Sequence, residues 1–319
     1  MTSKDTDNSA RSLQAIEQII QDLDGQDYIA TNQIATAVHV AQALEKPILV
    51  EGPAGVGKTE LAKAVAQMKS LALIRLQCYE GLDESKALYE WKYGKQLLYT
   101  QILREKLGDV LQGAQGLAES MQRLHQYSDV FFDREFLAPR PLLQALQSDD
   151  GAVLLIDEID KADYEFESLV LEVLSDFQVS VPELGTVRAE TRPLVFLTSN
   201  NARELSDALK RRCIHLYIDL PDSALEARIV ASRIPGIPDK LNAELVGFVQ
   251  ALRQLELKKL PAISETIDWA RTLLLLNAEQ LDRALVENTL NVLLKFREDI
   301  EQVEEQLPSL LASTNATRH

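Results

Sequence analysis

The sequence predicts an open α/β fold built on a parallel sheet, followed by a separate all-helical part. The first observation is a continuous apolar run over 152–156, bounded by Gly151 and Asp157, which is typical of a strand buried on both faces. The second is the alternation of short apolar runs with helical patterns, which predicts parallel strands joined by helices. The third is the end of all strand signals at Pro221, beyond which only helical spacing continues.

Length and charge limit the classes of protein that the chain can belong to. Its 319 residues suggest about two domains, and a hydrophobic share of 46% is ordinary for a globular protein. A net charge of −16 disfavours a nucleic-acid groove as the main working surface, because duplex binding relies on clustered Lys and Arg. We therefore expect nucleic acid to be an unlikely partner.

The cysteines and the hydropathy pattern bear on the compartment. Cys78 and Cys213 lie far apart without metal-site spacing, which predicts two reduced thiols. No apolar run approaches the roughly 18 residues that a membrane span requires. The first residues lack the apolar stretch of a signal peptide, so we expect a cytoplasmic protein.

The N-terminal segment carries two helical patterns before the first strand. Residues 1–11 are polar and are expected to be frayed, and apolar spacing predicts a helix over 12–23. This tail and helix occupy residues 1–24. A second helix follows over 34–44, and the apolar run 47–50 is the first strand.

The middle of the chain contains an irregular insert. A second strand is predicted over 71–76, and beyond it a helical pattern covers 95–111. A Gly- and Gln-rich break separates this pattern from a second helix that ends at Tyr127. A short helix over 141–147 then precedes the buried strand.

Four further elements complete the sheet domain, which we expect to span residues 25–220. A helix is predicted over 164–177, and alternation on both sides of a Gly-containing turn predicts a β-hairpin over 178–188. Apolar runs over 194–198 and 214–218 are the last two strands.

The C-terminal part is predicted to be a helical lid domain over 221–307. Leu, Ile and Val recur there at steps of three to four residues, separated by polar turns. Residues 308–319 follow a proline and are expected to form a disordered tail.

Residues 52–59 complete the pattern G-x-x-x-x-G-K-[ST] between a predicted strand and a predicted helix. Glycines at this spacing let the backbone turn with its N–H groups directed at a phosphate chain, which the positive end of the helix dipole also attracts. Lys58 brings a charge to the β- and γ-phosphates, and Thr59 offers a hydroxyl to Mg²⁺. We therefore expect ATP and Mg²⁺ as cofactors. The expected nucleotide-binding residues are Gly52, Pro53, Ala54, Gly55, Val56, Gly57, Lys58, Thr59, Glu60 and Asp157.

Asp157 and Glu158 follow the buried strand directly. Open α/β sheets place their ligands beyond the carboxyl ends of the strands. Asp157, with Thr59, is expected to hold Mg²⁺, mainly through water. Glu158 is expected to act as base or orienter for the water that attacks the γ-phosphate. The alternative is an acidic helix start, which the helix dipole also favours.

Two further positions are candidates for catalysis. Asn200 follows the strand 194–198, where its side chain can reach between the two phosphate motifs and position the lytic water. A turn that uses Asn for its left-handed backbone is the alternative. Arg212, or else Arg211, precedes the last strand and is expected to stabilise charge on the γ-phosphate of a neighbouring subunit. A solvated basic turn is the alternative there.

The strings GPAGVGKT, LLIDEID, TSNN and ALKRR, in this order and at these spacings, resemble the AAA+ ATPases. The resemblance implies a P-loop NTPase sheet with an αβα core and an α-helical lid. It also assigns family roles: Walker A to Gly52–Thr59, Walker B to Asp157 and Glu158, sensor 1 to Asn200, and the arginine finger to Arg212 or Arg211.

The insert and the hairpin before the Asn200 strand resemble the clade that holds MoxR proteins, magnesium chelatases and McrB. The amino-acid sequences of residues 77–101 and 263–273 are most similar to the MoxR branch called CoxD, which is associated with carbon monoxide dehydrogenase maturation. One motif departs from the MoxR pattern, because Ser264-Glu265-Thr266 stands where relatives often show Ser-Pro-Arg, the sensor 2 motif. Arg271 is a candidate replacement for that arginine.

Three aromatic residues of the insert, Tyr89, Trp91 and Tyr93, are candidates for contacting a client protein. The alternative is that they pack the insert onto the core.

The resemblance implies a Mg²⁺-dependent ATPase that assembles as a ring, expected to be a hexamer. Its hydrolysis would remodel a client protein or mature a metal-cofactor enzyme, with a partner that carries a von Willebrand factor A (VWA) domain. Two other hypotheses remain open. A McrB-like nucleic-acid translocase predicts basic residues on the hairpin, where the sequence has Glu183, Arg188 and Glu190. A nucleotide-gated scaffold with little turnover is disfavoured by the intact Asp157-Glu158 pair.

Overall fold

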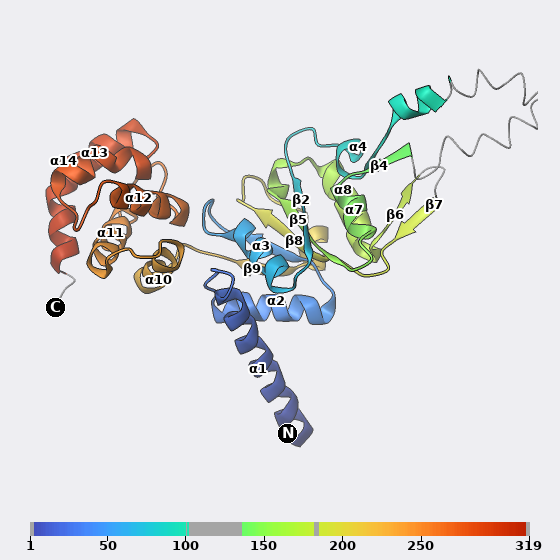
Figure 1. Ribbon diagram of the computed structural model, residues 1–319, viewed down its shortest axis with the longest axis horizontal. Helices are drawn as coiled ribbons and strands as arrows, with labels where there is room; N and C mark the ends of the chain where they lie inside the picture. The colour runs from blue at the N-terminus through green and yellow to red at the C-terminus, as the bar shows by residue number, and fades with distance from the viewer. Residues whose placement is uncertain (1–2, 100, 102–135, 182–184, 317–319) are drawn as a thin grey trace, which may run out of the picture.

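The computed structural model describes residues 3–99, 101, 136–181 and 185–316. Figure 1 shows two folded parts, one built around a sheet and one made of helices, joined by the segment that follows β9. None of the helices in these described ranges combines the length and the apolar character that a membrane crossing requires.

The sheet has five parallel strands in the spatial order β2-β5-β8-β1-β9. In chain order the strands are β1 (Ile48–Glu51), β2 (Ala72–Gln77), β5 (Ala152–Asp157), β8 (Leu194–Ser199) and β9 (Ile214–Tyr217). The predicted parallel α/β fold is therefore confirmed. Because the strands are parallel, their carboxyl ends share one edge of the sheet, and ligands bind at such an edge.

Helices cover both faces of the sheet. The helices on one face are α1 (Ser3–Asp24), α2 (Asn32–Leu44) and α3 (Lys58–Met68), and those on the other are α7 (Pro141–Leu146) and α8 (Tyr164–Asp176). The side chains of β5 point alternately to the two faces. Val153 and Leu155 pack with the first set of helices, and Leu154 and Ile156 pack with the second. This two-residue alternation explains why the run reads as continuously apolar.

The first helix begins earlier than expected. Residues 1–11 were predicted to be frayed, yet α1 starts at Ser3 and continues to Asp24. Ile19 and Leu23 near its end are buried in the core on the α2 side of the sheet, which ties the helix to the domain.

Two small antiparallel sheets accompany the central one. β6 (Gln178–Val181) and β7 (Gly185–Arg188) form the predicted hairpin. β3 (Tyr89–Trp91) pairs with β4 (Leu137–Pro139), which was not predicted because strands this short carry no readable alternation. Residues 93–99 are helical, and the remainder of the insert, including the helix expected to end at Tyr127, lies outside the described residues.

The short elements α4 (Glu84–Ala87), η3 (Ile159–Lys161) and α9 (Asp207–Arg212) complete the sheet part. The helical part contains α10 (Ser223–Arg233), α11 (Asp239–Leu252), α12 (Ile263–Leu275), α13 (Arg283–Leu293) and α14 (Arg297–Ala316). These helices share an apolar core around Trp269, Phe248 and Leu245.

The prediction of a disordered tail from residue 308 is wrong for residues 308–316, which belong to α14. Helix α14 continues through Pro308, because Val303, Leu307 and Leu310 lie on one face of it and are buried in the core of the helical part. That burial outweighs the backbone hydrogen bond that a proline cannot donate.

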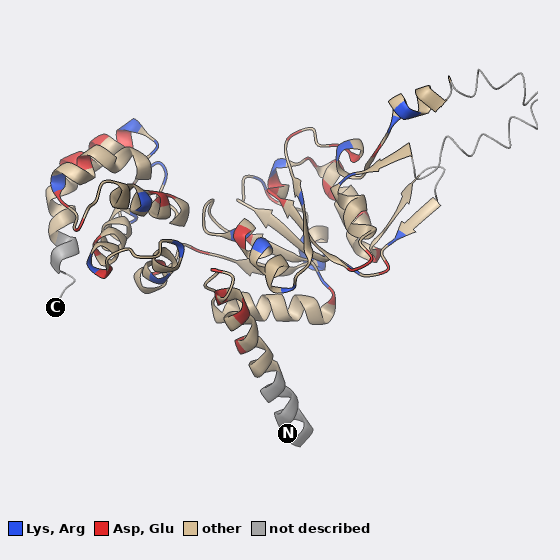
Figure 2. Cartoon of the chain, in the orientation of Figure 1, with Lys and Arg blue, Asp and Glu red and all other residues tan. Residues whose placement is uncertain are grey.

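Both cysteines are free thiols, as predicted. Burial raises the pKa of the Cys78 thiol and of the Cys213 thiol to about 12, so both stay protonated at neutral pH. Figure 2 shows basic and acidic residues of the described chain scattered over both parts in this view.

Candidate active site

The loop between β1 and α3 needs glycine at three positions. Gly52, Gly55 and Gly57 have φ angles of 147°, 80° and 97°, which L side chains rarely adopt. A Cβ at Gly52 would lie 2.0 Å from the carbonyl oxygen of Ile218, beside the end of β9. The glycines therefore allow the loop backbone to pass close to the residue that follows β9 before it enters α3.

Lys58 is the first residue of α3 and is buried. Its Nζ donates hydrogen bonds of 2.7 Å to the carbonyl oxygens of Gly52 and Pro53 and to Oδ1 of Asn200. Burial lowers the pKa of this ammonium, while the nearby carboxylates of Asp160 and Asp157 oppose the shift. The ammonium is thus held where the loop meets the end of β8.

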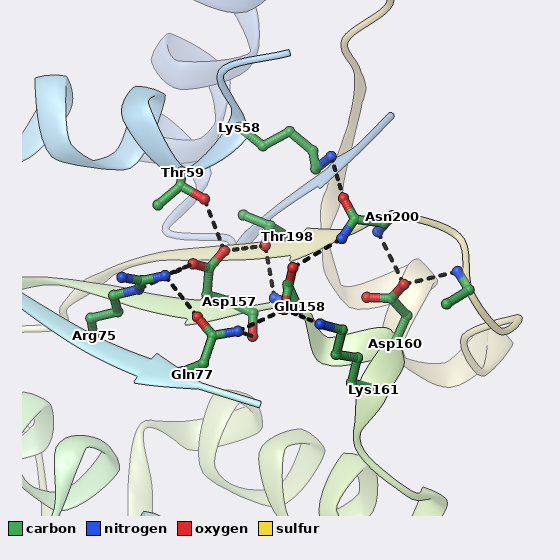
Figure 3. Close-up of polar contacts among 11 residues, drawn as sticks. Lys58, Thr59, Arg75, Gln77, Asp157, Glu158, Asp160, Lys161, Thr198 and Asn200 are labelled. Atoms are coloured by element: carbon green, nitrogen blue, oxygen red, sulfur yellow. Dashed lines mark hydrogen bonds and ion pairs between the residues drawn. The ribbon is translucent and has the colours of Figure 1, made fainter. Parts of the chain in front are cut away.

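Asp157 ends β5 and is buried, with both carboxylate oxygens engaged (Figure 3). Its Oδ1 accepts hydrogen bonds from the hydroxyls of Thr59, at 3.0 Å, and Thr198, at 2.6 Å. Its Oδ2 accepts from Arg75. The Thr59 hydroxyl and the Asp157 carboxylate are hard oxygen donors in contact, a donor set that fits Mg²⁺ with retained waters.

Glu158 comes directly after β5 and has a left-handed backbone, with a φ of 58°. Its amide donates to the Thr198 hydroxyl at 2.9 Å. Its Oε1 accepts from Asn200 at 3.2 Å, and its Oε2 accepts from Gln77 at 2.8 Å and from Lys161 at 2.6 Å. Neighbours from three segments therefore fix the direction of this carboxylate.

Asn200 connects the loop between β1 and α3, the phosphate loop, to Asp157 and Glu158, the acid pair. Its amide side chain accepts from Lys58 and donates to Glu158, as Figure 3 shows. Asp160 fixes the backbone beneath it, because its Oδ2 accepts from the amides of Asn200, at 3.1 Å, and Ala202, at 2.8 Å. The side chain of Asn200 therefore lies between Lys58 and Glu158 and contacts both.

A cavity of about 800 Å³ opens above this edge of the sheet. Its walls come from the phosphate loop, from Asp157 and Glu158, from the segment between α1 and α2, and from helices α10 and α12. The helical part reaches the phosphate loop directly, since the amide of Ser264 donates to the Gly55 carbonyl at 3.3 Å. The cavity has room for a nucleotide.

Two arginines of the helical part line the cavity. Arg271 does so while pairing with Asp268 at 3.4 Å. Arg233, at the end of α10, pairs with Glu60 of α3 at 3.4 Å. Arg233 escaped sequence reasoning because it belongs to no motif and reaches the site only through the packing of α10.

Arg211 and Arg212 lie at the end of α9, exposed to solvent and away from the residues that line the cavity. The fold therefore brings together Lys58, Thr59, Asp157, Glu158 and Asn200 and leaves the two arginines outside the site of their own chain.

The insert aromatics also lie apart from the cavity. Tyr89 and Trp91 are half-buried on β3, with ring centroids 6.1 Å apart in an edge-on arrangement. Tyr93 is exposed. The packing alternative therefore accounts for Tyr89 and Trp91, which lie against the sheet core on the α7 side.

Sequence reasoning missed four polar residues that contact the acid pair: Arg75, Gln77, Lys161 and Thr198. It also missed Asp160, which holds the backbone at Asn200, and Tyr28, which lines the cavity. Arg75 and Gln77 lie on one face of β2, which pairs with β5 so that Gln77 stands opposite Asp157. The polar alternation within an otherwise apolar strand was the signal that could have found them.

The chain is similar to several known proteins. The family model for the AAA domain, dynein-related subfamily, matches residues 47–213. The denitrification regulatory protein NirQ of Stutzerimonas stutzeri is 24% identical over 228 residues, covering 69% of this chain and 68% of NirQ. An uncharacterized protein of Staphylococcus aureus is 25% identical over 281 residues, covering 84% of this chain and 93% of that protein.

Among solved structures, a mutant of RuvB from Thermotoga maritima matches with a TM-score of 0.46 and 18% identity, covering 82% of this chain and 68% of that chain. The RuvB Holliday junction branch migration motor of the same organism matches with a TM-score of 0.42 and 18% identity, covering 82% of this chain and 67% of that chain.

Proposed function

Because the chain belongs to the AAA domain family, in its dynein-related subfamily, we propose that it is a Mg²⁺-dependent ATPase of the MoxR type. The single observation that carries the proposal is the connected set Lys58–Asn200–Glu158, next to the Thr59–Asp157 pair, at one wall of the cavity. Residues from three distant parts of the sequence meet there with the groups that phosphoryl transfer to water requires.

Each residue of the set has a proposed role. The loop amides and Lys58 bind the β- and γ-phosphates, and Thr59 with Asp157 would hold Mg²⁺. When bound, Mg²⁺ would neutralise phosphate charge. Glu158 takes the proton from the attacking water, and Asn200 orients that carboxylate through its 3.2 Å hydrogen bond. Glu60 and Arg233 contact the nucleotide beyond the phosphates, since both line the cavity.

We further propose a ring in which Arg212, or Arg211, completes the site of a neighbouring subunit. Their exposure on α9, outside the cavity of their own chain, supports action across an interface. Residues 25–220 would form the nucleotide-binding domain, and the helical part from 221 would be the lid. A hexamer is the expected assembly.

The proposed role of the ring is to remodel a client protein or to mature a metal-cofactor enzyme, together with a VWA-domain partner. The similarity to a protein named as a denitrification regulatory protein supports a role in acting on other enzymes. The two free thiols support a reducing, cytoplasmic setting. The scattered charges of the described chain give the translocase alternative little support (Figure 2).

The test compares ATP turnover of the wild type with that of Glu158→Gln. Loss of a positioned base is expected to lower kcat by roughly 10²–10⁴-fold while ATP still binds. Glu165→Gln, on the exposed first turn of α8, is the matched control and should behave as the wild type. Equal turnover of wild type and Glu158→Gln would mean that Glu158 does not catalyse the reaction, and negligible turnover of both proteins would favour the nucleotide-gated scaffold.

The same variant identifies the client. Held in ATP, Glu158→Gln should retain bound protein partners that are recovered by pull-down, including a VWA-domain protein. Stimulation of wild-type turnover by DNA, with no retained protein, would favour the translocase.

A further inference from the structure

Arg75 contacts the buried carboxylate of Asp157 from outside the cavity. It lies on β2, the edge strand of the sheet, two residues before the position opposite Asp157. Its Nη2 lies 2.5 Å and its Nε 3.1 Å from Oδ2 of Asp157. The arginine side chain is 48% exposed, whereas that of Asp157 is 3% exposed. A solvent-reaching cation therefore holds a carboxylate that faces the cavity.

The other cations around the acid pair are directed elsewhere. Lys58 donates to two loop carbonyls and to Asn200, and Lys161 donates to Glu158. A buried carboxylate needs a nearby opposite charge or it becomes strongly destabilising. Arg75 supplies this charge for Asp157 through direct contact.

The two sides of the Asp157 carboxylate serve different partners. Oδ1 accepts from the Thr59 and Thr198 hydroxyls, and Oδ2 accepts from Arg75. The hydroxyl of Thr59 belongs to the donor set that fits Mg²⁺, so a guanidinium and a divalent cation would share one carboxylate. Two positive groups that share a single negative charge oppose one another.

We propose that Arg75 is the counter-ion of Asp157 in the metal-free site and that it weakens the binding of Mg²⁺ there. This inference rests on the proposed function, because it takes Asp157 to serve Mg²⁺. By lowering the affinity, Arg75 lets the metal leave with the spent nucleotide and keeps the empty site stable.

A purely structural ion pair is the competing explanation. Arg75 also donates to Gln77 at 2.7 Å, so it could serve only to join the edge strand to β5. That explanation predicts a lower melting temperature for a neutral variant and an unchanged dependence of nucleotide binding on Mg²⁺. The counter-ion role predicts a change in the Mg²⁺ dependence itself.

The experiment titrates the full-length protein with MgCl₂ in the presence of fluorescent ADP and follows nucleotide binding. For Arg75→Gln, the Mg²⁺ concentration at half-maximal binding should fall at least about tenfold, since a unit charge beside the metal is removed. Arg75→Lys keeps the charge and should stay within about threefold of the wild type.

Arg140→Gln is the matched control. Arg140 is 46% exposed and pairs with Glu90 in the β3–β4 region, away from the cavity, so its loss should leave the titration unchanged. Thermal melting checks that each variant is folded at the assay temperature. If Arg75→Gln is not, Arg75→Met supplies the same loss of charge at similar side-chain length.

Two results separate the possible failures. The counter-ion role is overturned if the neutral Arg75 variants need the same Mg²⁺ concentration for half-maximal binding as the wild type, or a higher one. Either result leaves the ATPase proposal intact. Wild-type protein that binds no ADP at any Mg²⁺ concentration shows instead that the proposed function is wrong.

Discussion

The ammonium of Lys58 lies 2.7 Å from the side-chain oxygen of Asn200, although the two residues are 142 positions apart in the chain. This hydrogen bond joins the start of α3 to the end of β8. Asn200 donates in turn to Glu158. The group proposed to bind phosphate is thereby linked to the proposed base through one hydrogen-bonded side chain.

Lys58→Ala is expected to abolish nucleotide binding. Removing a buried, charge-assisted contact to the phosphates should cost on the order of 2–4 kcal/mol, or roughly 30- to 1,000-fold in Kd. Isothermal titration with ADP and ATP measures this loss. Lys69→Ala, at the exposed C-terminal end of the same helix, should bind as the wild type does. Undiminished affinity of Lys58→Ala for ATP would contradict the assignment of the loop.

Asn200→Ala should lower turnover by roughly 10²-fold, because Glu158 loses the donor that orients it toward the water. Nucleotide affinity should change little, since Lys58 keeps two carbonyl acceptors. Steady-state kinetics separate kcat from KM. Asn201→Gly, which suits the φ of 59° at that exposed position, is the control. A rise in KM with unchanged kcat would assign Asn200 to binding alone.

Arg212→Ala is expected to leave nucleotide binding intact and to lower turnover on the order of 10³-fold, the effect of losing an arginine finger. Arg211→Ala tests the alternative residue on the same helix. Mixing Arg212→Ala with Glu158→Gln subunits should restore part of the activity, because some interfaces then combine an intact base with an intact finger. Full turnover in both arginine variants, or no rescue on mixing, argues against a site shared between subunits.

The helical part depends on a buried ion pair. Arg253 and Glu226 form two hydrogen bonds of 2.7 Å, and their side chains are 5% and 0% exposed. Arg253→Met leaves the carboxylate unpaired and should destabilise this part by about 3–5 kcal/mol, measured by urea unfolding. The double variant with Glu226→Gln should recover part of the loss. Arg297→Met removes an exposed pair with Glu301 and should leave the unfolding midpoint unchanged.

The local pattern of residues determined the phosphate loop and the sheet strands. Three glycines, a lysine and a threonine at fixed spacing prescribe a backbone path that depends only on φ preferences and on the adjoining helix start. The apolar run of β5 likewise predicted a strand buried on both faces, because burial follows from composition alone when both faces are covered.

Tertiary structure decided which side chains support these motifs. Arg75 reaches Asp157 only because β2 is the neighbour of β5, and no spacing in the chain reveals strand order. Arg233 reaches Glu60 only because the end of α10 and the first turn of α3 line the same cavity. Helix α14 passes through Pro308 for a similar reason, since the burial of Leu307 and Leu310 overrides the local preference of proline. Local patterns fix backbone conformation, whereas contacts between distant segments depend on how the whole chain packs.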